Sequence, residues 1–522
     1  MKKYLSILGV LVLGTAIRLI NYTGISLWHD EAFSALLIKY PFSEMIHRIG
    51  LDVHPPLYYI FLRIWAVPFG DSLASLRGFS VFFGVGTIML AYLLVKAVFK
   101  SERAALICAL LVALNPFQIQ YVSEARMYTM GAFFAVLAAF LLVRALDFET
   151  LKAQTQLDAQ ANKKRILYYI LFALSSGIMM LTHYYLLFTA AALCGYAFLY
   201  TAYLYRFQIK NYISLLLTGI LILASFAPYI PTFLYQFKQV GAGYWIPPID
   251  RWSIPTTLWQ MLVGIGVDIA KPRTQILVSI VTAITVFLLV QFARKAKGQH
   301  KWLILIALVA PFAGSLAFAV LAHLKGSSTS VYLIRYFLYA STFYTIIIGL
   351  WLSNISWRKT SAGIMSVYVG ICLFSVYHFW DDVNVKARPG MGAAAKYLKA
   401  NVGPNDKLYV GSSFEFFNYK YYNQLPETAT GVTPFLFSGG TTDIRSLPHY
   451  AGTAILTNED RLPDFKAATK PGDTVWRLWT NGFGGSKPTT PDNFEKVGEE
   501  VSYPDIRPYI GTYIYVTQYK VK

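Results

Sequence analysis

Residues 78–95 read GFSVFFGVGTIMLAYLLV, a run without a single charged residue between Arg77 and Lys96. An α-helix needs about 20 largely apolar residues to cross the hydrocarbon core of a bilayer. Similar runs recur along most of the chain, whose residues are 56% apolar and only 14% charged. Soluble proteins average about 25% charged residues. The sequence therefore predicts a polytopic α-helical membrane protein.

Eleven stretches have the length and hydropathy of membrane-spanning helices. They lie near residues 4–22, 72–97, 104–121, 127–146, 166–181, 184–205, 211–233, 274–293, 302–323, 333–353 and 361–379. The first run follows Met1-Lys2-Lys3 as in a signal peptide, but no small-x-small cleavage site follows it, so we expect an uncleaved span. Residues 55–69 are apolar but too short for an ordinary span, which predicts a helix in the outer membrane interface.

The basic residues between the spans predict the orientation of the chain, because Lys and Arg concentrate in cytoplasmic loops. If the N-terminus is cytoplasmic, every basic cluster lies on the cytoplasmic side; the clusters are near residues 2–3, 96–103, 163–165, 206–210, 294–301 and 358–359. Segments 23–71 and 236–272 and the tail after residue 380 then face outward. We expect a multi-pass protein of the inner or plasma membrane with an extracytoplasmic C-terminal domain.

The net charge of +19 does not indicate a nucleic-acid partner. Many of the basic residues fall between spans, where anionic membrane lipids are their natural partners. Neither a Gly-rich phosphate loop, nor a zinc-ligand array, nor an RNA-binding aromatic motif accompanies them. Membrane lipids are therefore the expected partners of these charges.

The composition changes after Trp380. We predict a transmembrane domain over residues 1–380, with a catalytic first outer loop at 23–71, and a small α/β domain over 381–522. In this domain, a short helix is expected at residues 392–400 and strand-like segments at 407–412, 453–456, 474–479 and 511–518.

Two adjacent acidic residues, Asp30 and Glu31, follow the first span. Carboxylates at a membrane interface are costly unless they serve a function. Adjacent side chains on a helix point about 100° apart, so one can act as a base while the other orients a ligand, a cation or a backbone amide. The alternative is that Asp30 only caps a helix that begins near Glu31.

Further polar residues gather at the predicted outer ends of the spans. Asp52 and His54 precede two prolines, and a carboxylate–imidazole pair of this kind can bind a metal or an anionic ligand. Glu124 and Arg126 are too close in sequence to pair on a helix. Arg126 suits a phosphate, which arginine binds in a bidentate manner, although an arginine can also extend to lipid headgroups.

Arg335 lies at the outer start of a span, against the positive-inside preference, which favours a ligand or ion-pair role. His183 also lies near an outer end, where a packing role is the simpler interpretation. A divalent metal ion is the one cofactor left open. Its candidate ligands are Glu31, Asp52, His54, Glu124 and His183.

The order of these motifs resembles a known family. Asp30-Glu31, residues 52–59 (DVHPPLYY), residues 123–128 (SEARMY) and Arg335-Tyr336 are similar to the GT-C fold membrane glycosyltransferases that use polyprenyl-phosphate sugars. Within that fold the chain resembles glycosyltransferase family 39, the protein O-mannosyltransferases, and the lipid A aminoarabinose transferases. The similarity covers about residues 1–380, and the tail resembles the small outward-facing domain of the bacterial members.

The resemblance implies inverting transfer of a sugar from undecaprenyl or dolichyl phosphate on the extracytoplasmic face. The acceptor is a lipid, a glycan or a protein; the β-trefoil insertion of the eukaryotic protein mannosyltransferases is missing, which weakens the case for a protein. The resemblance places catalysis on Asp30 and Glu31, with Asp30 as the base. The residues expected to bind donor phosphate or substrate are Arg126, Arg335, Glu124, Tyr128, His54 and Asp52.

The competing function is a transporter or flippase for a lipid-linked or anionic substrate. Such proteins place charges near the middle of the bilayer and are built from two related halves. In this sequence the candidate residues gather at one predicted face, and eleven spans do not divide into equal halves. These features favour a glycosyltransferase over a transporter or flippase.

Overall fold

The computed structural model describes residues 2–206, 208–242, 245–355, 358–382, 389–437, 447, 449–462, 468–482, 484–485, 487–505 and 511–522. The chain forms two compact units. The helical unit comprises Met1–Ile20, His54–Tyr58 and Gly78–Phe379. The mixed unit comprises Asn21–Val53, Tyr59–Arg77 and Trp380–Lys522.

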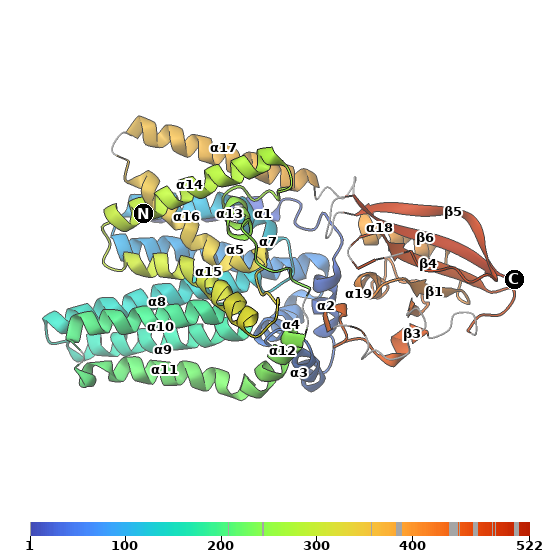
Figure 1. Cartoon of the computed structure of the whole chain (residues 1–522), viewed down its shortest axis with the longest axis horizontal. Coiled ribbons are helices and arrows are strands. Elements are labelled where there is room, and N and C mark those ends of the chain that lie inside the picture. Colours follow the sequence, from blue (N-terminus) through green and yellow to red (C-terminus); the bar gives the residue numbers. More distant parts are fainter. Residues whose placement is uncertain are drawn as a thin grey trace. The chain divides into compact units, whose positions relative to one another are not determined.

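Mostly apolar helices of different lengths build the helical unit (Figure 1). They are α1 (Lys2–Leu19), α5 (Leu73–Phe99), α6 (Glu102–Leu114), α7 (Pro116–Val122), α8 (Tyr128–Gln154), α9 (Ala159–Thr182), α10 (Leu186–Tyr205), α11 (Ile213–Phe226), α12 (Ile230–Ala242), α13 (Ser253–Val263), α14 (Pro272–Lys295), α15 (Lys301–Leu324), α16 (Leu338–Ser353) and α17 (Arg358–Asp382). Short 3₁₀ turns η1 (Ile209–Tyr212), η2 (Ala227–Tyr229) and η3 (Ile334–Phe337) precede α11, α12 and α16.

Each of the eleven predicted spans falls on a helix, but two of them differ from a straight full-length span. Among the described residues, nine helices are long and apolar enough to cross a membrane. A tenth span is broken, because α6 and α7 meet at an angle of 52°. The apolar part of α1, Leu5–Leu19, is shorter than the others, as is α4 (Leu57–Phe69), which occupies the predicted interface segment.

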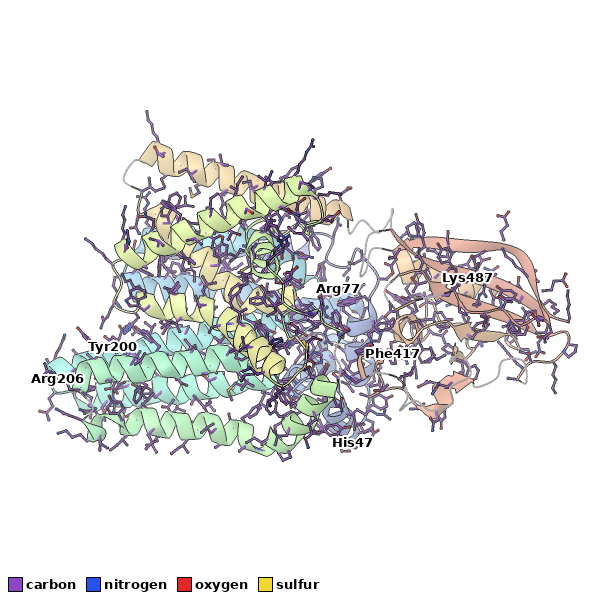
Figure 2. The ribbon with its side chains drawn as sticks, viewed as in Figure 1. His47, Arg77, Tyr200, Arg206, Phe417 and Lys487 are labelled. Atoms are coloured by element: carbon purple, nitrogen blue, oxygen red, sulfur yellow. The ribbon has the colours of Figure 1, made fainter. Side chains whose placement is uncertain are left out.

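The basic loops of the helical unit meet at one end of it. Asp147 lies 3.4 Å from Lys100 and 3.4 Å from Arg144, and its other carboxylate oxygen lies 3.4 Å from His300. The His300 ring in turn packs 4.7 Å from that of Tyr200, which Figure 2 shows at this end. Loops from separate spans that we expect on the cytoplasmic side therefore share one end of the bundle. The side of the membrane that this end faces stays a prediction.

The polar segment 147–165 is mostly helical. It completes α8 and begins α9, with Asp158 capping α9 by accepting a hydrogen bond from the Ala161 N–H. Buried Glu149 pairs with Arg165 and accepts a hydrogen bond of 2.9 Å from Tyr205. A buried charge needs such a partner, so this segment links α8 to α9 and α10.

Arg18 is a buried arginine that stabilises the break between α6 and α7. It is 2% exposed and donates hydrogen bonds to the backbone oxygens of Ala113 at 2.7 Å and Val112 at 3.1 Å. The last carbonyl groups of a helix have no partner within that helix. In an apolar environment these oxygens need a donor, which α1 supplies.

The mixed unit contains one six-stranded sheet in its described part, in the order β3-β2-β1-β4-β6-β5 (Figure 1). Strands β1 to β4 pair in parallel, whereas β4, β6 and β5 pair antiparallel. The strands are β1 (Lys407–Val410), β2 (Pro434–Phe437), β3 (Arg461–Leu462), β4 (Thr474–Thr480), β5 (Phe494–Asp505) and β6 (Thr512–Val521). The helices are α2 (His29–Leu37), α3 (Phe42–Leu51), most of α4, α18 (Gly390–Asn401) and α19 (Ser413–Tyr422).

The expected α/β character of the tail is therefore correct, and the predicted helix and three of the four predicted strands are present. The prediction of a strand at residues 453–456 is wrong. These residues form turns between the 3₁₀ turns η5 (His449–Ala451) and η6 (Asn458–Asp460), and Gly452 has a φ of 81°. Short apolar stretches do not by themselves distinguish a strand from a buried turn.

The outer loop packs against the tail. The Leu27 N–H donates to the Tyr422 hydroxyl at 3.1 Å, and the His29 ring lies 4.6 Å from that of Phe414 and 5.3 Å from that of Phe417. The predicted boundary after residue 380 thus coincides with a unit boundary, whereas loop 23–71, which we placed with the helices, belongs largely to the mixed unit.

A buried carboxyl makes the stability of the mixed unit depend on pH. Glu415 on α19 is 6% exposed, and burial, followed by the charge of Asp505, raises its pKa to about 8. Folding therefore favours the protonated form, so this stabilisation is fully present below the unfolded pKa of about 4.5 and is lost as pH rises to about 8. The change corresponds to at most about 5 kcal/mol.

We expect the melting temperature of the purified protein to fall between pH 5 and pH 8, and Glu415→Gln to flatten that profile. Glu427→Gln is the matched control, because Glu427 is exposed in the same unit. A Glu415→Gln profile as steep as that of the wild type would contradict the assignment.

Candidate functional site

The start of α2 holds a buried ion pair. Arg77 donates to both oxygens of Glu31, from Nε at 2.9 Å and from Nη2 at 2.8 Å, and both side chains are fully buried. Arg77 also donates to the backbone oxygens of Tyr22, Ile25 and Ser26 at 2.9–3.3 Å. Bidentate Arg–carboxylate pairs are geometrically specific. This network holds the turn before α2 and the first turn of α2 in one arrangement.

Asp30 lies in the same first turn but in a different environment. It is partly exposed, whereas Glu31 is completely buried. The interpretation of Asp30 as a helix cap is wrong: α2 begins at His29, and Glu31 accepts the Trp28 N–H at 3.4 Å. The two adjacent carboxylates thus differ in environment: Glu31 is paired with the buried Arg77, and Asp30 is partly exposed.

The Asp52–His54 motif crosses the boundary between the two units. Asp52 ends α3 and belongs to the mixed unit, and its N–H donates to Ile49 at 3.1 Å. His54 belongs to the helical unit, where Gln236 donates to its backbone oxygen at 3.4 Å and Tyr184 donates to Gln236.

The helical unit gathers the other predicted site residues around His183. We name this group the His183 cluster; it comprises His54, Arg126, Tyr128, His183, Arg335, Tyr336 and Tyr339. The His183 ring lies 4.5 Å from that of Tyr336, 5.5 Å from that of Tyr339 and 5.9 Å from that of His54. The Arg335 guanidinium lies 5.8 Å from the Tyr128 ring and 5.7 Å from the Trp245 ring, within cation–π range.

The cluster lies at the end of the bundle opposite Asp147. Tyr128 begins α8, whose other half carries Arg144 and Asp147, and His183 directly follows α9, whose first turns carry Arg165. The candidate residues are therefore at the ends of the spans that we predict to face outward.

The break between α6 and α7 positions Arg126. Asn115 caps α7 by accepting the Gln118 N–H at 3.0 Å, and its side-chain amide donates to Met261 at 3.0 Å and to Thr345 at 3.2 Å. After α7 ends, the Glu124 backbone oxygen accepts hydrogen bonds from the Arg126 N–H at 2.9 Å and from Ser80 at 2.6 Å. Arg126 is consequently held 97% buried in a compact turn rather than extended toward lipid.

His183 is held neutral. Burial, followed by the nearby charges of His54, Arg126 and Arg335, keeps the pKa of His183 well below its ordinary value. Its Nδ1 accepts the Tyr185 N–H at 3.2 Å, so the proton of the neutral ring is on Nε2. The cluster thus combines two guanidinium groups with neutral donors, which is the composition of a site for an anion.

The residues suggested for a metal ion are divided between the two units: Glu31 and Asp52 belong to the mixed unit, and His54, Glu124 and His183 to the helical unit. Among the residues described, no three His, Cys, Asp or Glu side chains are grouped closely enough to hold a metal. Glu31 is bound to Arg77, and His183 lies beside Arg126 and Arg335, whose positive charges oppose a second cation. The anionic ligand is the better fit to this chemistry.

Comparison with known proteins agrees with this picture. A family model described as dolichyl-phosphate-mannose-protein mannosyltransferase matches residues 53–231. The matched range contains the whole SEARMY motif and all of the DVHPPLYY motif except Asp52. The crystal structure of ArnT from Cupriavidus metallidurans bound to undecaprenyl phosphate superimposes with a TM-score of 0.57. That match covers 98% of this chain and 97% of ArnT at 12% identity. The chain has the GT-C membrane fold.

The same enzyme in its apo state gives a TM-score of 0.54 at 14% identity and covers 98% of each chain. A search of curated protein sequences finds no match. The GT-C fold therefore extends over nearly the whole chain, including the small sheet domain. These matches confirm the resemblance that the motifs indicate. The family model covers about a third of the sequence, and the similarity in fold covers 98% of the chain.

The sequence motifs predicted most residues at the start of α2 and in the His183 cluster, but not the buried residues that bind them. In the sequence, Arg77 stands out only as the charged residue before the uncharged run 78–95, and its five hydrogen bonds follow from the tertiary structure. Its position next to a long uncharged run was the available signal, since an arginine there needs a partner. Arg18 carried the same kind of signal, since an arginine within an apolar span also needs a partner, whereas Tyr339 carried none.

Proposed function

We propose that the protein is an integral membrane glycosyltransferase of the cell membrane. It takes a sugar from a polyprenyl-phosphate donor and transfers it, with inversion, to a lipid, glycan or protein acceptor on the extracytoplasmic face. The observation that carries the proposal is the His183 cluster, a group of arginines, histidines and tyrosines at one end of the bundle. Its members are buried except His54 and Arg335, which are partly exposed. The family model and the GT-C fold support the same reaction class.

Asp30 is the proposed base. The acceptor hydroxyl or phosphate oxygen attacks the anomeric carbon, and its proton passes to the Asp30 carboxylate. Glu31 takes no proton in this scheme, because Arg77 binds both of its oxygens; it is a positioning residue for the first turn of α2. Asp30 is partly exposed, as a group that meets an acceptor must be.

The His183 cluster is the proposed site for the donor phosphate. As the bond between the anomeric carbon and the phosphate oxygen breaks, its electron pair passes to that oxygen and negative charge grows there. Arg126 and Arg335 stabilise this charge, since donors already oriented toward a developing charge need no reorganisation. Neutral His183 can add an Nε2–H hydrogen bond. With phosphate as the leaving group, one base and a cationic phosphate site are a sufficient set.

Donor binding tests this assignment without an acceptor. We expect Arg126→Gln and Arg335→Gln each to weaken binding of radiolabelled undecaprenyl phosphate to the purified full-length protein by about ten-fold or more, because each removes charge-assisted hydrogen bonds. Arg294→Gln is the control, since Arg294 is exposed near the opposite, basic end of the bundle. Unchanged affinity in both Arg126→Gln and Arg335→Gln would refute the phosphate site.

Turnover then tests the function itself. The purified protein is incubated with a panel of radiolabelled polyprenyl-phosphate sugars, membrane lipids and cell-wall glycans. Transfer that depends on Asp30 identifies both the enzyme and its sugar. Binding of undecaprenyl phosphate with movement of the lipid across vesicles, and without sugar transfer, would instead favour the flippase.

A further inference from the structure

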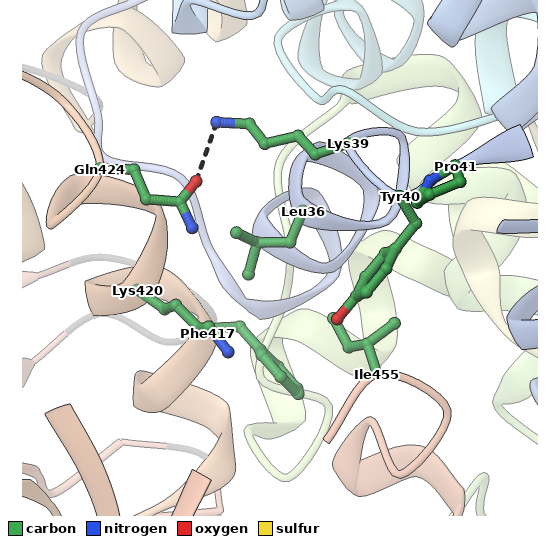
Figure 3. Close-up of a pocket in the computed structure, with 8 residues that line it drawn as sticks. All are labelled: Leu36, Lys39, Tyr40, Pro41, Phe417, Lys420, Gln424 and Ile455. Carbon is green, nitrogen blue, oxygen red and sulfur yellow. Dashed lines mark hydrogen bonds between the residues drawn. The ribbon is translucent and has the colours of Figure 1, made fainter. Parts of the chain in front are cut away.

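The mixed unit contains a pocket of about 190 Å³. It is lined by Leu36, Lys39, Tyr40, Pro41, Phe417, Lys420, Gln424 and Ile455 (Figure 3). These residues come from α2, from the segment that follows it, from α19, from the turn after α19 and from the turn at residue 455. The turn after α2 is only a few residues along the chain from Asp30, so the pocket is built on the same short helix as the proposed base.

The two sides of the pocket differ in chemistry. Figure 3 shows Lys39 and Gln424 on one side, joined by a hydrogen bond of 2.9 Å, and Tyr40 and Ile455 on the other. Leu36 and Phe417 are buried and supply apolar surface. Apolar walls with a few oriented polar groups are typical of small-molecule sites.

The charges around the pocket are arranged asymmetrically. Lys39 forms an ion pair with Asp71 at 2.8 Å, and Lys420 with Asp460 at 2.6 Å. Both lysines line the pocket, but neither aspartate does. The pocket lining therefore carries N–H donors and positive charge, while the carboxylates that pair with the two lysines are not part of it. An ammonium group has three donors, so each lysine can bind its aspartate and a ligand oxygen together.

We propose that this pocket binds a saccharide unit that carries an acidic group, a carboxylate or a phosphate. The acidic group contacts Lys39 and Lys420, and the apolar face of the sugar ring packs against Tyr40, Leu36 and Phe417. The inference rests on the proposed function in one respect: the bound saccharide is part of the acceptor, held on the helix that carries Asp30.

Ligand binding to the full-length protein in detergent tests the pocket without any donor. We would measure saturation-transfer NMR signals for glucuronate, glucose 6-phosphate, glucose and inorganic phosphate. Glucuronate and glucose 6-phosphate separate the carboxylate from the phosphate form of the acid. We expect one or both to bind at least about ten-fold more tightly than glucose, since a charged hydrogen bond changes affinity by this order.

Variants assign that binding to the pocket. Lys420→Met and the double variant Lys420→Met/Asp460→Asn are both expected to reduce it by about ten-fold. The double variant leaves no unpaired carboxylate at residue 460. A loss of ligand binding in both variants is therefore not caused by an unpaired charge that disturbs folding. Lys496→Met, an exposed lysine on β5, is the control and should bind as the wild type does.

Three results would overturn the proposal: binding unchanged in both Lys420 variants, glucose bound as tightly as the acidic sugars, or inorganic phosphate bound as tightly as glucose 6-phosphate. The last would indicate a simple anion site. Failure of the proposed function is a separate result. A protein that binds acidic sugars but transfers no sugar from any donor would support the saccharide pocket and contradict the proposed glycosyltransferase activity.

Discussion

Asp30→Asn should lower the rate of sugar transfer by about 10²- to 10⁴-fold, the usual contribution of a positioned general base. Asparagine keeps the size and shape of the side chain and cannot take up the acceptor proton. Transfer is measured with purified protein and a radiolabelled polyprenyl-phosphate sugar. Binding of undecaprenyl phosphate should stay unchanged, because its phosphate is assigned to the His183 cluster.

Asp492→Asn is the matched control, since Asp492 is an exposed aspartate before β5. The melting temperature of Asp30→Asn should match that of the wild type, because the substitution keeps the shape of a partly exposed side chain and leaves the bidentate Arg77–Glu31 pair in place. Near-wild-type transfer by a folded Asp30→Asn protein would show that another group accepts the proton.

Arg77→Met should destabilise the mixed unit by about 3–5 kcal/mol, because it leaves the buried Glu31 carboxylate without its cation. It also removes the donors to three backbone oxygens in the turn before α2. A lower melting temperature and faster proteolysis of the outer loop would report this loss. Glu31→Gln should act in the same direction, since Arg77 is then the uncompensated charge.

The double variant Glu31→Met/Arg77→Met separates the ion pair from the backbone bonds. Apolar side chains of similar volume often replace a buried ion pair without loss of stability. We therefore expect the double variant to be more stable than either single variant but less stable than the wild type. Transfer should remain low, because the first turn of α2 no longer holds Asp30 in place. Wild-type stability of Arg77→Met would contradict the role of the network.

Much of the fold could be predicted from local patterns. Uncharged runs such as residues 78–95 have one stable form in lipid, a helix, because each backbone group must find its partner within the segment. The Asn115–Pro116 pair also explains why one of these runs breaks, since the proline ends α6 and the asparagine caps α7. In the tail, β6 was recognisable because the segment is rich in Tyr, Ile, Val and Thr, residues typical of strands.

The motifs identified the candidate site residues but not how they associate. Asp52 and His54 are two residues apart and belong to different compact units, whereas His54 and His183 are far apart in sequence and their rings lie 5.9 Å apart. Spacing along the chain determines neighbours only within one helix or strand. The two lysines of the pocket, Lys39 and Lys420, illustrate the same limit, since no local pattern connects them.

Hydropathy, helix-breaking residues and the cost of charge in lipid are local properties, and they predict the class of protein, its membrane helices and the residue types of its chemistry. The burial and the partner of each charged side chain depend on how the chain packs. Glu31 and Asp30 are neighbours with similar side chains, yet packing places Arg77 against the first and leaves the second partly exposed. Burial and partners are properties of the packed chain, and they separate a positioning carboxylate from a proposed base.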